Sequence, residues 1–439
     1  MKQLMAFTDR RLSVPLILGI LSLVLLLPEC RAAIAKYDEY LQKRAEEASE
    51  EALKAFDPNP EKLADDLNYQ VSESGDLFPK FMSLLRERTG NRRLKEGDCK
   101  ATNPIDRCWR CDPDWAKNRQ KLADCARGFG HRATGGQGGR FYVVTDPSDD
   151  DMDKPKPGTL RHAAIQKEPL WIIFANHMVI KLKEELLFSS NKTVDGRGAK
   201  VHIAYGAGIT LQFVHNVIIH NIRIHNIHAA SGGMIRDAVD HIGLRTRSDG
   251  DGISVFNSNT IWIDHVSLSK GTDGLIDVIE GSTAITISNC KFNNHNDVML
   301  LGANDSTAKD SIMQITVAFN RFGKGLIQRM PRIRWGFVHV INNDYSTGKC
   351  TPSAVAPTPP LSARVTKRIF GTKKEWEKWQ WRSEGDKFTN GAYFIESGPP
   401  IRHEDLPTEK SLIKFKPGSF AGRLTRYAGA LKCREGKLC

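Results

Sequence analysis

Residues 261–292 read IWIDHVSLSKGTDGLIDVIEGSTAITISNCKF, a stretch in which two similar motifs follow one another. In each motif an apolar anchor is followed five residues later by a second large apolar residue, as Leu268 follows Ile263 and Phe292 follows Ile287. Such anchors recur at Ile219, Ile263, Ile287, Val317 and Val340, and the last four are 24, 30 and 23 residues apart. Self-similarity at this interval is typical of a solenoid in which each repeat forms one coil.

The composition of the repeats favours strands over helices. The segments are rich in Ile, Val and Thr, with Asn and Gly between them, whereas leucine-rich repeats would require regular leucines and a helix in each turn. Strands buried on their inner face and polar outside fit an all-β protein built as a parallel β-helix. Asn320 and Asn343 recur three residues after their anchors and predict a short asparagine ladder, which Ile222, Val266 and Cys290 interrupt. A two-sheet sandwich is the alternative architecture.

The N-terminal part of the chain differs from the repeats. Arg10 and Arg11 precede the apolar run 14–27, and small residues follow at 33–35, which is the layout of a secretory signal peptide over residues 1–35. An uncleaved membrane anchor is the alternative, but the run is shorter than the ~20 residues that a spanning helix needs. Residues 36–98 are rich in Glu, Lys, Ala and Leu and predict a small helical extension ahead of a main domain over 99–439.

The chain carries 63 Lys and Arg residues against 51 Asp and Glu, a formal net charge of +12. This excess favours polyanionic partners, but it does not distinguish nucleic acid, acidic lipid and acidic polysaccharide. Secretion would expose the cysteines to an oxidising environment, so the eight that follow the signal peptide are candidates for disulfides. Cys108 and Cys111 form a single CxxC without a second copy, which argues against zinc. Asn191 and Asn304 begin possible glycosylation motifs.

Four aspartates occupy two neighbouring repeats. Asp249 and Asp251 lie in a loop before one repeat, and Asp273 and Asp277 begin the next. Residues at i and i+2, or at i and i+4, share a face of a strand, and adjacent coils would stack the two pairs. Converging carboxylates repel one another unless a cation lies between them, and Ca²⁺, which takes six to eight oxygen ligands, is the natural choice. The alternative is that Asp-Gly only marks turns.

Three arginines lie within six residues, at Arg329, Arg332 and Arg334. A guanidinium group binds carboxylates in a bidentate manner, so this row predicts a site for an acidic substrate beside the acidic pairs. A nucleic-acid surface is the competing interpretation, but it would require aromatic stacking partners or a known module.

Taken together, the motifs of this sequence resemble those of the plant pectate lyases of polysaccharide lyase family 1, in particular pollen-type members with an N-terminal helical extension. The segments that carry the resemblance are 103–110, 193–198, 248–253, 262–265, 281–289, 298–302, 328–332, 381–386 and 390–394. They follow one order across residues 99–439.

The resemblance implies a right-handed, single-stranded parallel β-helix with its active cleft on an outer sheet. It implies a secreted, cell-wall enzyme that cleaves de-esterified (1→4)-α-D-galacturonan by Ca²⁺-assisted β-elimination, acts as a monomer, and binds neither nucleic acid nor, after signal cleavage, membrane. The residues that match family positions are Asp249, Asp251, Asp273 and Asp277 for calcium, Arg329 as the base, Arg332 and Arg334 for substrate, and Cys108 with Cys125 as a disulfide.

Three positions depart from the family pattern. Asp297 stands where members often have lysine or glutamate, and Ala303 stands where histidine is usual. The segment 346–364 is shorter and richer in proline than in the family, so about one coil is missing or replaced by a loop. A pectate-binding wall protein without turnover is therefore the alternative function.

Overall fold

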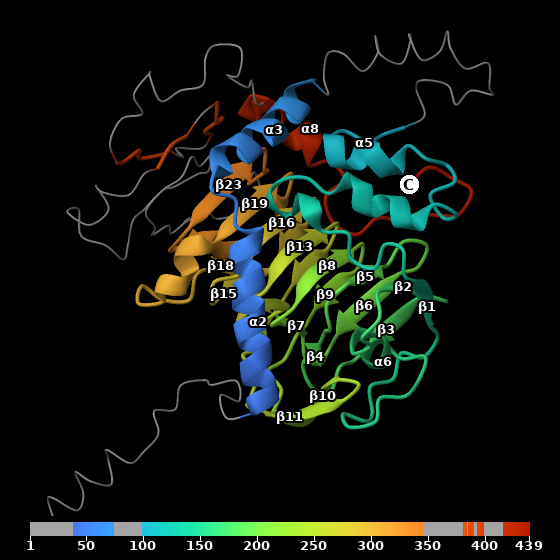
Figure 1. The fold of residues 1–439 in the computed structure, drawn as a ribbon. Coiled ribbons are helices and arrows are strands. Elements are labelled where there is room, and N and C mark those ends of the chain that lie inside the picture. The colour runs from blue at the N-terminus through green and yellow to red at the C-terminus, as the bar shows by residue number, and fades with distance from the viewer. Residues whose placement is uncertain (1–37, 74–98, 346–380, 384, 390–392, 399–415) are drawn as a thin grey trace, which may run out of the picture.

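The computed structural model describes residues 38–73, 99–345, 381–383, 385–389, 393–398 and 416–439, and these residues form three parallel sheets wound into a β-helix (Figure 1). The eight-stranded sheet contains β1 (Arg140–Val144), β2 (Leu170–Phe174), β5 (Lys192–Asp195), β8 (His215–His220), β13 (Asn259–Asp264), β16 (Thr283–Ser288), β19 (Gln314–Ala318) and β23 (Phe337–Ile341). The seven-stranded sheet contains β4 (Leu186–Leu187), β7 (Ile209–Gln212), β12 (Ile253–Phe256), β15 (Gly274–Ile279), β18 (His295–Leu301), β21 (Leu326–Gln328) and β22 (Arg332–Ile333). The six-stranded sheet contains β3 (Met178–Ile180), β6 (Val201–Ala204), β9 (Arg223–His225), β14 (Ser267–Ser269), β17 (Lys291–Asn293) and β20 (Arg321–Phe322).

The strand register confirms the repeat predicted from the anchors. Ile219, Ile263, Ile287, Val317 and Val340 pair directly with one another across the eight-stranded sheet. The second apolar residues, Ile224, Leu268, Phe292 and Phe322, pair in the same way across the six-stranded sheet. Both rows lie inside the β-helix, where Phe292, Phe322 and Tyr345 stack with ring centroids 5.0 and 4.6 Å apart. The parallel β-helix is therefore confirmed and the two-sheet sandwich is wrong.

Side-chain amides hold the turns between the eight- and six-stranded sheets. Asn320 Oδ1 accepts from the Cys290 amide at 2.7 Å, and Asn343 Oδ1 accepts from the Asn320 amide at 2.8 Å, which confirms the short ladder. A second row, one residue earlier, was not predicted. Its members, Asn221, His265, Asn289, Phe319 and Asn342, all have φ between 48° and 60°. Asparagine adopts this left-handed conformation more readily than most residues, which accounts for its frequency at the corner.

Helical segments cover the outer face of the eight-stranded sheet. Trp171 and Trp262, on β2 and β13, are fully buried beneath α5 (Pro104–Arg110), η1 (Arg119–Cys125) and the C-terminal residues. Disulfides join Cys99 to Cys111, Cys108 to Cys125 and Cys433 to Cys439, and Cys290 is a buried free thiol. Both cysteines of the CxxC pair are thus in separate disulfides. The other short helices are η2 (Phe129–Arg132), α6 (Leu160–Ala164), η3 (Ala308–Ile312), η4 (Gly418–Phe420) and α8 (Ala421–Leu424).

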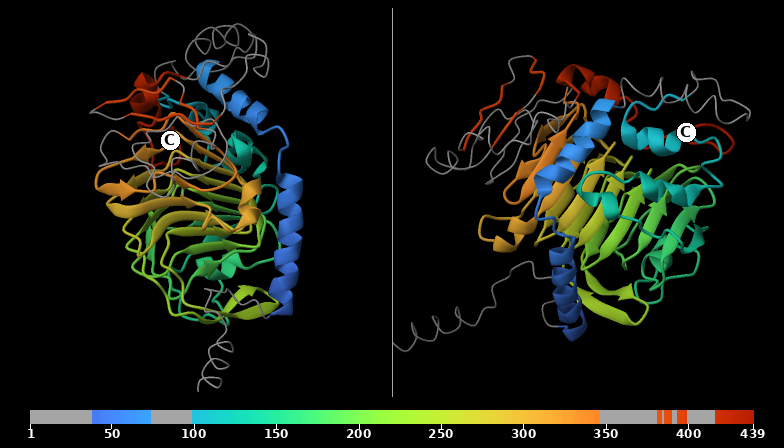
Figure 2. Two further views of the ribbon diagram at one scale, coloured as in Figure 1. Left: turned by 90° about the vertical axis from the view of Figure 1, so that its left-hand side faces the viewer. Right: turned by 45° about the horizontal axis from the view of Figure 1, so that its top comes forward.

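The described part of the N-terminal extension, residues 38–73, forms the helices α2 (Glu39–Ala55) and α3 (Pro60–Glu73). Helix α2 runs along the stack of coils (Figure 2), beside the turns that lead from the seven-stranded to the eight-stranded sheet. Its Arg44 forms an ion pair with Asp237 at 3.2 Å, in the hairpin of β10 (Gly233–Ala238) and β11 (His241–Arg245). The predicted signal peptide and the segment 346–364 lie outside the described residues. Within the described ranges, no helix is long and apolar enough to cross a membrane.

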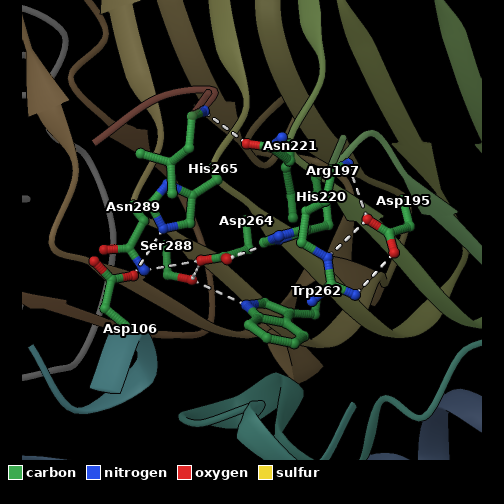
Figure 3. Close-up of polar contacts among 12 residues, drawn as sticks. Asp106, Asp195, Arg197, His220, Asn221, Trp262, Asp264, His265, Ser288 and Asn289 are labelled. Carbon is green, nitrogen blue, oxygen red and sulfur yellow. Dashed lines mark hydrogen bonds and ion pairs between the residues drawn. The ribbon is translucent and has the colours of Figure 1, made fainter. Parts of the chain in front are cut away.

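A buried polar network ties the segment around α5 and the C-terminal residues to the β-helix (Figure 3). The ring of His265 contacts Asp106 Oδ1 at 2.7 Å through Nε2 and the carbonyl of Gly429 at 2.9 Å through Nδ1. Asp106 also pairs with Arg110 at 2.7 Å. Asp106 and Gly429, which are far apart in sequence, therefore both contact His265.

Candidate active site

Three carboxylates converge at one place on the seven-stranded sheet. Asp251 precedes β12, Asp273 precedes β15, and Asp277 lies within β15. One oxygen of each lies within 4.8 Å of the others. The amide of Gly274 donates to Asp251 Oδ1 at 2.7 Å, and a Cβ atom at Gly274 would lie only 2.3 Å from Asp277 Oδ1. The cluster therefore requires glycine at this position, because any side chain would occupy the space of the carboxylates.

The electrostatics of the cluster favour a cation. Burial raises the pKa of Asp251 to about 7, and the charges of Asp273 and Asp249 add to the shift. Burial, followed by Asp251 and Asp273, raises the pKa of Asp277 well above its ordinary range. Asp277 Oδ1 is buried and has no hydrogen-bond partner within the described part of the chain. A hard divalent cation with oxygen ligands would supply that partner and relieve the repulsion, so the residues fit Ca²⁺.

Asp249 does not join this cluster, although the sequence predicts it as a ligand. It is exposed, and its pKa is raised by burial of part of the carboxyl group, by Asp273 and by Glu185. Gly250 has a φ of 91°, so residues 249–251 form a turn and not a strand. The rule that i and i+2 share a face consequently does not apply here, and Asp249 lies at the edge of the cluster.

Arg329 lies beside the acidic cluster, between β21 and β22. It has a φ of 55°, and its Nε atom is 3.1 Å from Asp297 Oδ1 on β18. Asp297 pairs in register with Gly274 on one side and Gln328 on the other, so it lies directly between the acidic cluster and the arginine. The positive charge of Arg329 lowers the pKa values of Asp251 and Asp277 against the effect of burial. Arg329 therefore lies within electrostatic reach of both carboxylates.

Arg332 and Arg334 continue the cationic row along the same sheet. Arg332 lies opposite Leu300, and Arg334 donates to the carbonyl of Gly302 at 2.9 Å and pairs with Asp305 at 3.2 Å. Burial lowers the pKa of both guanidinium groups, and the charge of Arg329 lowers them further. An anionic ligand would relieve this crowding of positive charge, as predicted for an acidic substrate.

Two residues at the site were not predicted from the sequence. His295 contacts the carbonyl of Asp273 through Nε2, and Gly274 makes room for the carboxylates. His295 lies two residues before Asp297 on β18, so its position on the same face could have been inferred once that strand was assigned.

The predicted glycosylation positions differ in their surroundings. Asn191 is half-buried and its Oδ1 accepts from Asn216 at 2.7 Å. Asn304 is exposed and adjoins Asp305, the partner of Arg334. Both remain predictions.

Comparison with known proteins places this arrangement in a family. The family model described as "Pectate lyase" matches residues 174–358, and the one described as "Pectate lyase, N terminus" matches residues 33–91. A pectate lyase of Lilium longiflorum is 53% identical over 422 residues, which cover 93% of this chain and 95% of the relative. The chain belongs to the pectate lyase family.

Further relatives agree with this assignment. The probable pectate lyase P59 of Solanum lycopersicum is 51% identical and is covered over 96% of its length. Among solved structures, the cedar pollen allergen jun a 1 is 42% identical and superposes with a TM-score of 0.68, covering 75% of this chain and 99% of that chain. The family models thus match the N-terminal extension and most of the β-helix of this pectate lyase.

Proposed function

We propose that this pectate lyase is a secreted enzyme that cleaves de-esterified (1→4)-α-D-galacturonan by Ca²⁺-assisted β-elimination. The observation that supports this most directly is the convergence of Asp251, Asp273 and Asp277 beside Arg329, Arg332 and Arg334 on one sheet. An acidic cluster and a cationic row side by side match a polyanionic substrate that binds both to a cation and to arginines.

Ca²⁺, when bound, would supply positive charge that stabilises a uronate carboxylate as negative charge develops next to it. Asp251, Asp273 and Asp277 would hold the ion, with Asp249 contributing from the edge of the cluster. Arg332 and Arg334 would bind uronate carboxylates and orient the sugar whose C5–H bond breaks. Their guanidinium groups are planar and donate two parallel hydrogen bonds, which fixes the sugar as well as attracting it.

Arg329 would remove the proton from C5. The electrons of the C5–H bond then form the double bond to C4, and the glycosidic oxygen at C4 leaves and takes a proton from solvent. The product is a 4,5-unsaturated uronate. No water attacks the sugar, so the paired carboxylates of a hydrolase are not required. A base must be unprotonated, whereas Asp297 at 3.1 Å stabilises a charged guanidinium, so the pair has to open when substrate binds.

The pair between Arg329 and Asp297 also supports a second candidate, a pectate-binding wall protein without turnover. The two functions differ in one measurement, the absorbance of the unsaturated product. We expect the mature protein to release this product from polygalacturonate in Ca²⁺, to stop in excess chelator, and to resume when Ca²⁺ is restored. Full activity in chelator would contradict the calcium assignment. A folded protein that binds polygalacturonate and releases no product would establish the binding function.

The same assay tests the substrate. Arginines and a bridging cation both require free carboxylates, so de-esterified polygalacturonate should be cleaved faster than highly methylated pectin. Faster cleavage of the methylated polymer would overturn this part of the proposal.

A further inference from the structure

The outer face of the six-stranded sheet carries a row of basic side chains that the proposed reaction does not use. The strand register places Val179, His202, Arg223, Ser267, Lys291 and Arg321 in one continuous row across β3, β6, β9, β14, β17 and β20. Neighbouring members are one strand spacing apart, about 4.8 Å. Four of the six are basic, and the row follows the axis of the β-helix.

Among the residues that the structure describes, this row contains no carboxylate. The next outward row contains Ala204, His225, Ser269 and Asn293, again without an acidic residue. Exposed lysines Lys200, Lys270 and Lys324 flank the strands, and Asp344 enters only beyond the end of the row, 3.8 Å from Arg321. Positive charge is dense enough here to act on a titrating neighbour. Burial lowers the pKa of His202, and the charges of Arg223, His225 and Lys200 lower it further.

This face is partly exposed within the described part of the chain: Val179 is exposed and the other members of the row are half-buried. The C-terminal residues cross the middle of the row, where Arg223 donates to the carbonyl of Ala430 at 3.1 Å and the amide of Ala430 donates to Ser267 Oγ at 2.9 Å. Tyr205 is 53% exposed and lies edge-on to His225, with ring centroids 5.5 Å apart. Its ring offers an apolar surface next to the cations, as a sugar ring requires.

We propose that this face is a second, non-catalytic binding site for an extended segment of de-esterified galacturonan. Basic side chains lie on adjacent strands, about 4.8 Å apart, at two places in the row, His202 with Arg223 and Lys291 with Arg321, so neighbouring carboxylates of an extended polyanion can meet neighbouring basic groups there. The polymer that the catalytic sheet is proposed to cleave is also the anion that surrounds the enzyme, and the inference shares that substrate class. Nucleic acid fits less well, because a single exposed aromatic ring gives no series of stacking platforms for bases.

The two sites differ in their dependence on metal. On the seven-stranded sheet the carboxylates repel a polyanion unless a cation neutralises them, whereas the six-stranded sheet contains no carboxylate in either outward row. Binding at the second face should therefore persist in chelator and weaken with salt, since exposed charges are screened. Such a site would hold the enzyme on its polymer between cleavage events.

The test uses the mature protein in excess chelator, which prevents cleavage, with soluble polygalacturonate as the probe. The variant K270Q/K291Q/K324Q removes three charges from the face, and K43Q/K62Q/K121Q removes three exposed charges from helical segments elsewhere. We expect the dissociation constant for polygalacturonate to be at least tenfold higher for the first variant and to change less than twofold for the second. Cleavage of short oligogalacturonates in Ca²⁺ should be equal in all three proteins, because these fit the catalytic sheet alone.

Several results would overturn the inference. They are wild-type protein that does not bind polygalacturonate in chelator, equal losses in the two triple variants, equal binding of fully methylated pectin, and duplex DNA that competes as well as polygalacturonate at equal charge. Loss of binding in K270Q/K291Q/K324Q without any lyase activity in the wild type would support the second site and contradict the proposed reaction. Cleavage without charge-dependent binding in chelator would do the reverse.

Discussion

Asp297 lies between the two charged groups of the site, and its own charge opposes the chemistry proposed for Arg329. Its carboxylate is 3.1 Å from Arg329 Nε, and both side chains are less than one-fifth exposed. Poorly solvated charges interact more strongly than exposed ones, so the carboxylate of Asp297 holds the Arg329 side chain and repels an incoming uronate.

Removing this charge is therefore expected to accelerate the reaction. Asp297→Asn should raise kcat about tenfold, equivalent to ~1.4 kcal/mol, and Asp297→Lys should lower KM for polygalacturonate by adding a cation beside the substrate. Asp305→Asn is the matched control, because that carboxylate pairs with Arg334 and is 76% exposed. Its kcat should stay within about twofold of wild type, since exposed pairs contribute little. A slower Asp297→Asn enzyme would mean that the carboxylate positions Arg329 productively.

The arginines can be separated by the kinetic constant that each affects. Arg329→Lys keeps a positive charge but changes the base, so kcat should fall by several orders of magnitude while polygalacturonate binding remains. Arg334→Ala removes a bidentate partner of a uronate and should cost ~1–3 kcal/mol, seen mainly in KM. Steady-state kinetics with a separate binding titration distinguishes these outcomes. Equal effects of both changes on KM alone would refute the base assignment for Arg329.

Calcium binding should depend on pH because the cluster holds protons at neutral pH. The pKa of Asp251 is raised from 3.8 to about 7 and that of Asp277 is raised well above 3.8, so the metal-free site loses stability as pH rises above 3.8 and its carboxyls ionise. Ca²⁺ must displace these protons, and its apparent affinity should increase between about pH 5 and pH 8. Calorimetry in buffers of different ionisation enthalpy measures the proton release. Asp249→Asn should change it little, whereas Asp277→Asn should abolish most of it.

At this scale the sequence was informative about residue type and less so about geometry. Asp251, Asp273 and Asp277 could be grouped because they lie in two coils whose strands are neighbours in one sheet. Asp249 could not be placed, because the turn at Gly250 depends on a local φ that the alternation of residues does not reveal. The pairing of Asp297 with Arg329 depends on the register of β18 with β21, which is set by the coil and not by either residue.

At the scale of the elements, the repeat was predictable because its two apolar rows each fill one interior corner. Anchor and second residue are five apart in the coils whose anchors are Ile219, Ile263, Ile287, Val317 and Val340, so this spacing indicates the short turn between the two sheets. Val194 and Ile203, which pair with Ile219 and Ile224, are nine apart, so the pattern does not extend to their coil. The connections between the six-stranded and the seven-stranded sheets vary in length. The antiparallel hairpin β10–β11 lies within one of these connections, and no periodicity in the sequence predicts it. The docking of α2 could not be predicted from the sequence either, since the residues that it contacts, such as Asp237 and Asn257, lie about two hundred residues away in the chain.

Helix α2 docks through the buried side chains Leu41, Ala48 and Ala52 and through polar contacts, several of them at its N-terminal half. Arg44 pairs with Asp237, whose carboxylate also contacts His241 at 2.6 Å, and the His241 ring stacks on Tyr40 at 4.0 Å. Arg44→Ala should weaken the docking by ~1–3 kcal/mol because Asp237 is buried and would lose a partner. Hydrogen exchange of the α2 amides should then be faster, while that of β13 is unchanged. Lys43→Ala, on the solvent side, is the control, and equal exchange in both variants would contradict this role.

At the scale of the whole molecule, the network around His265 connects the segment that contains α5 to the C-terminal residues (Figure 3). Residues near α5 and the C-terminal residues both lie over the eight-stranded sheet, and His265 contacts one acceptor from each. Both ring nitrogens face acceptors, so the ring donates twice when protonated. Burial alone would lower the pKa of His265, but Asp106 and Asp264 outweigh it and raise the pKa above 6.5. The contacts that join Asp106 and Gly429 through His265 thus depend on a buried imidazolium.

This gives a pH dependence with a definite direction. A raised folded pKa contributes stability that is complete below 6.5 and is lost as pH rises through the folded value. His265→Gln should therefore destabilise the protein by ~3–5 kcal/mol near pH 6, because Asp106 loses its charged partner, and by less as pH approaches about 9. Denaturant titrations at several pH values measure the difference in unfolding free energy between variant and wild type.

His220 provides the matched control. It is as fully buried as His265 and contacts Asp264 at 3.0 Å, but burial lowers its pKa below 6.5, so it is neutral from about pH 7 upward. His220→Gln should lower stability by an amount that does not change between about pH 7 and pH 9. If the loss in His265→Gln were equally independent of pH, the ring would be neutral in the folded protein. The connection between the α5 segment and the C-terminal residues would then depend on packing and on the pair between Asp106 and Arg110.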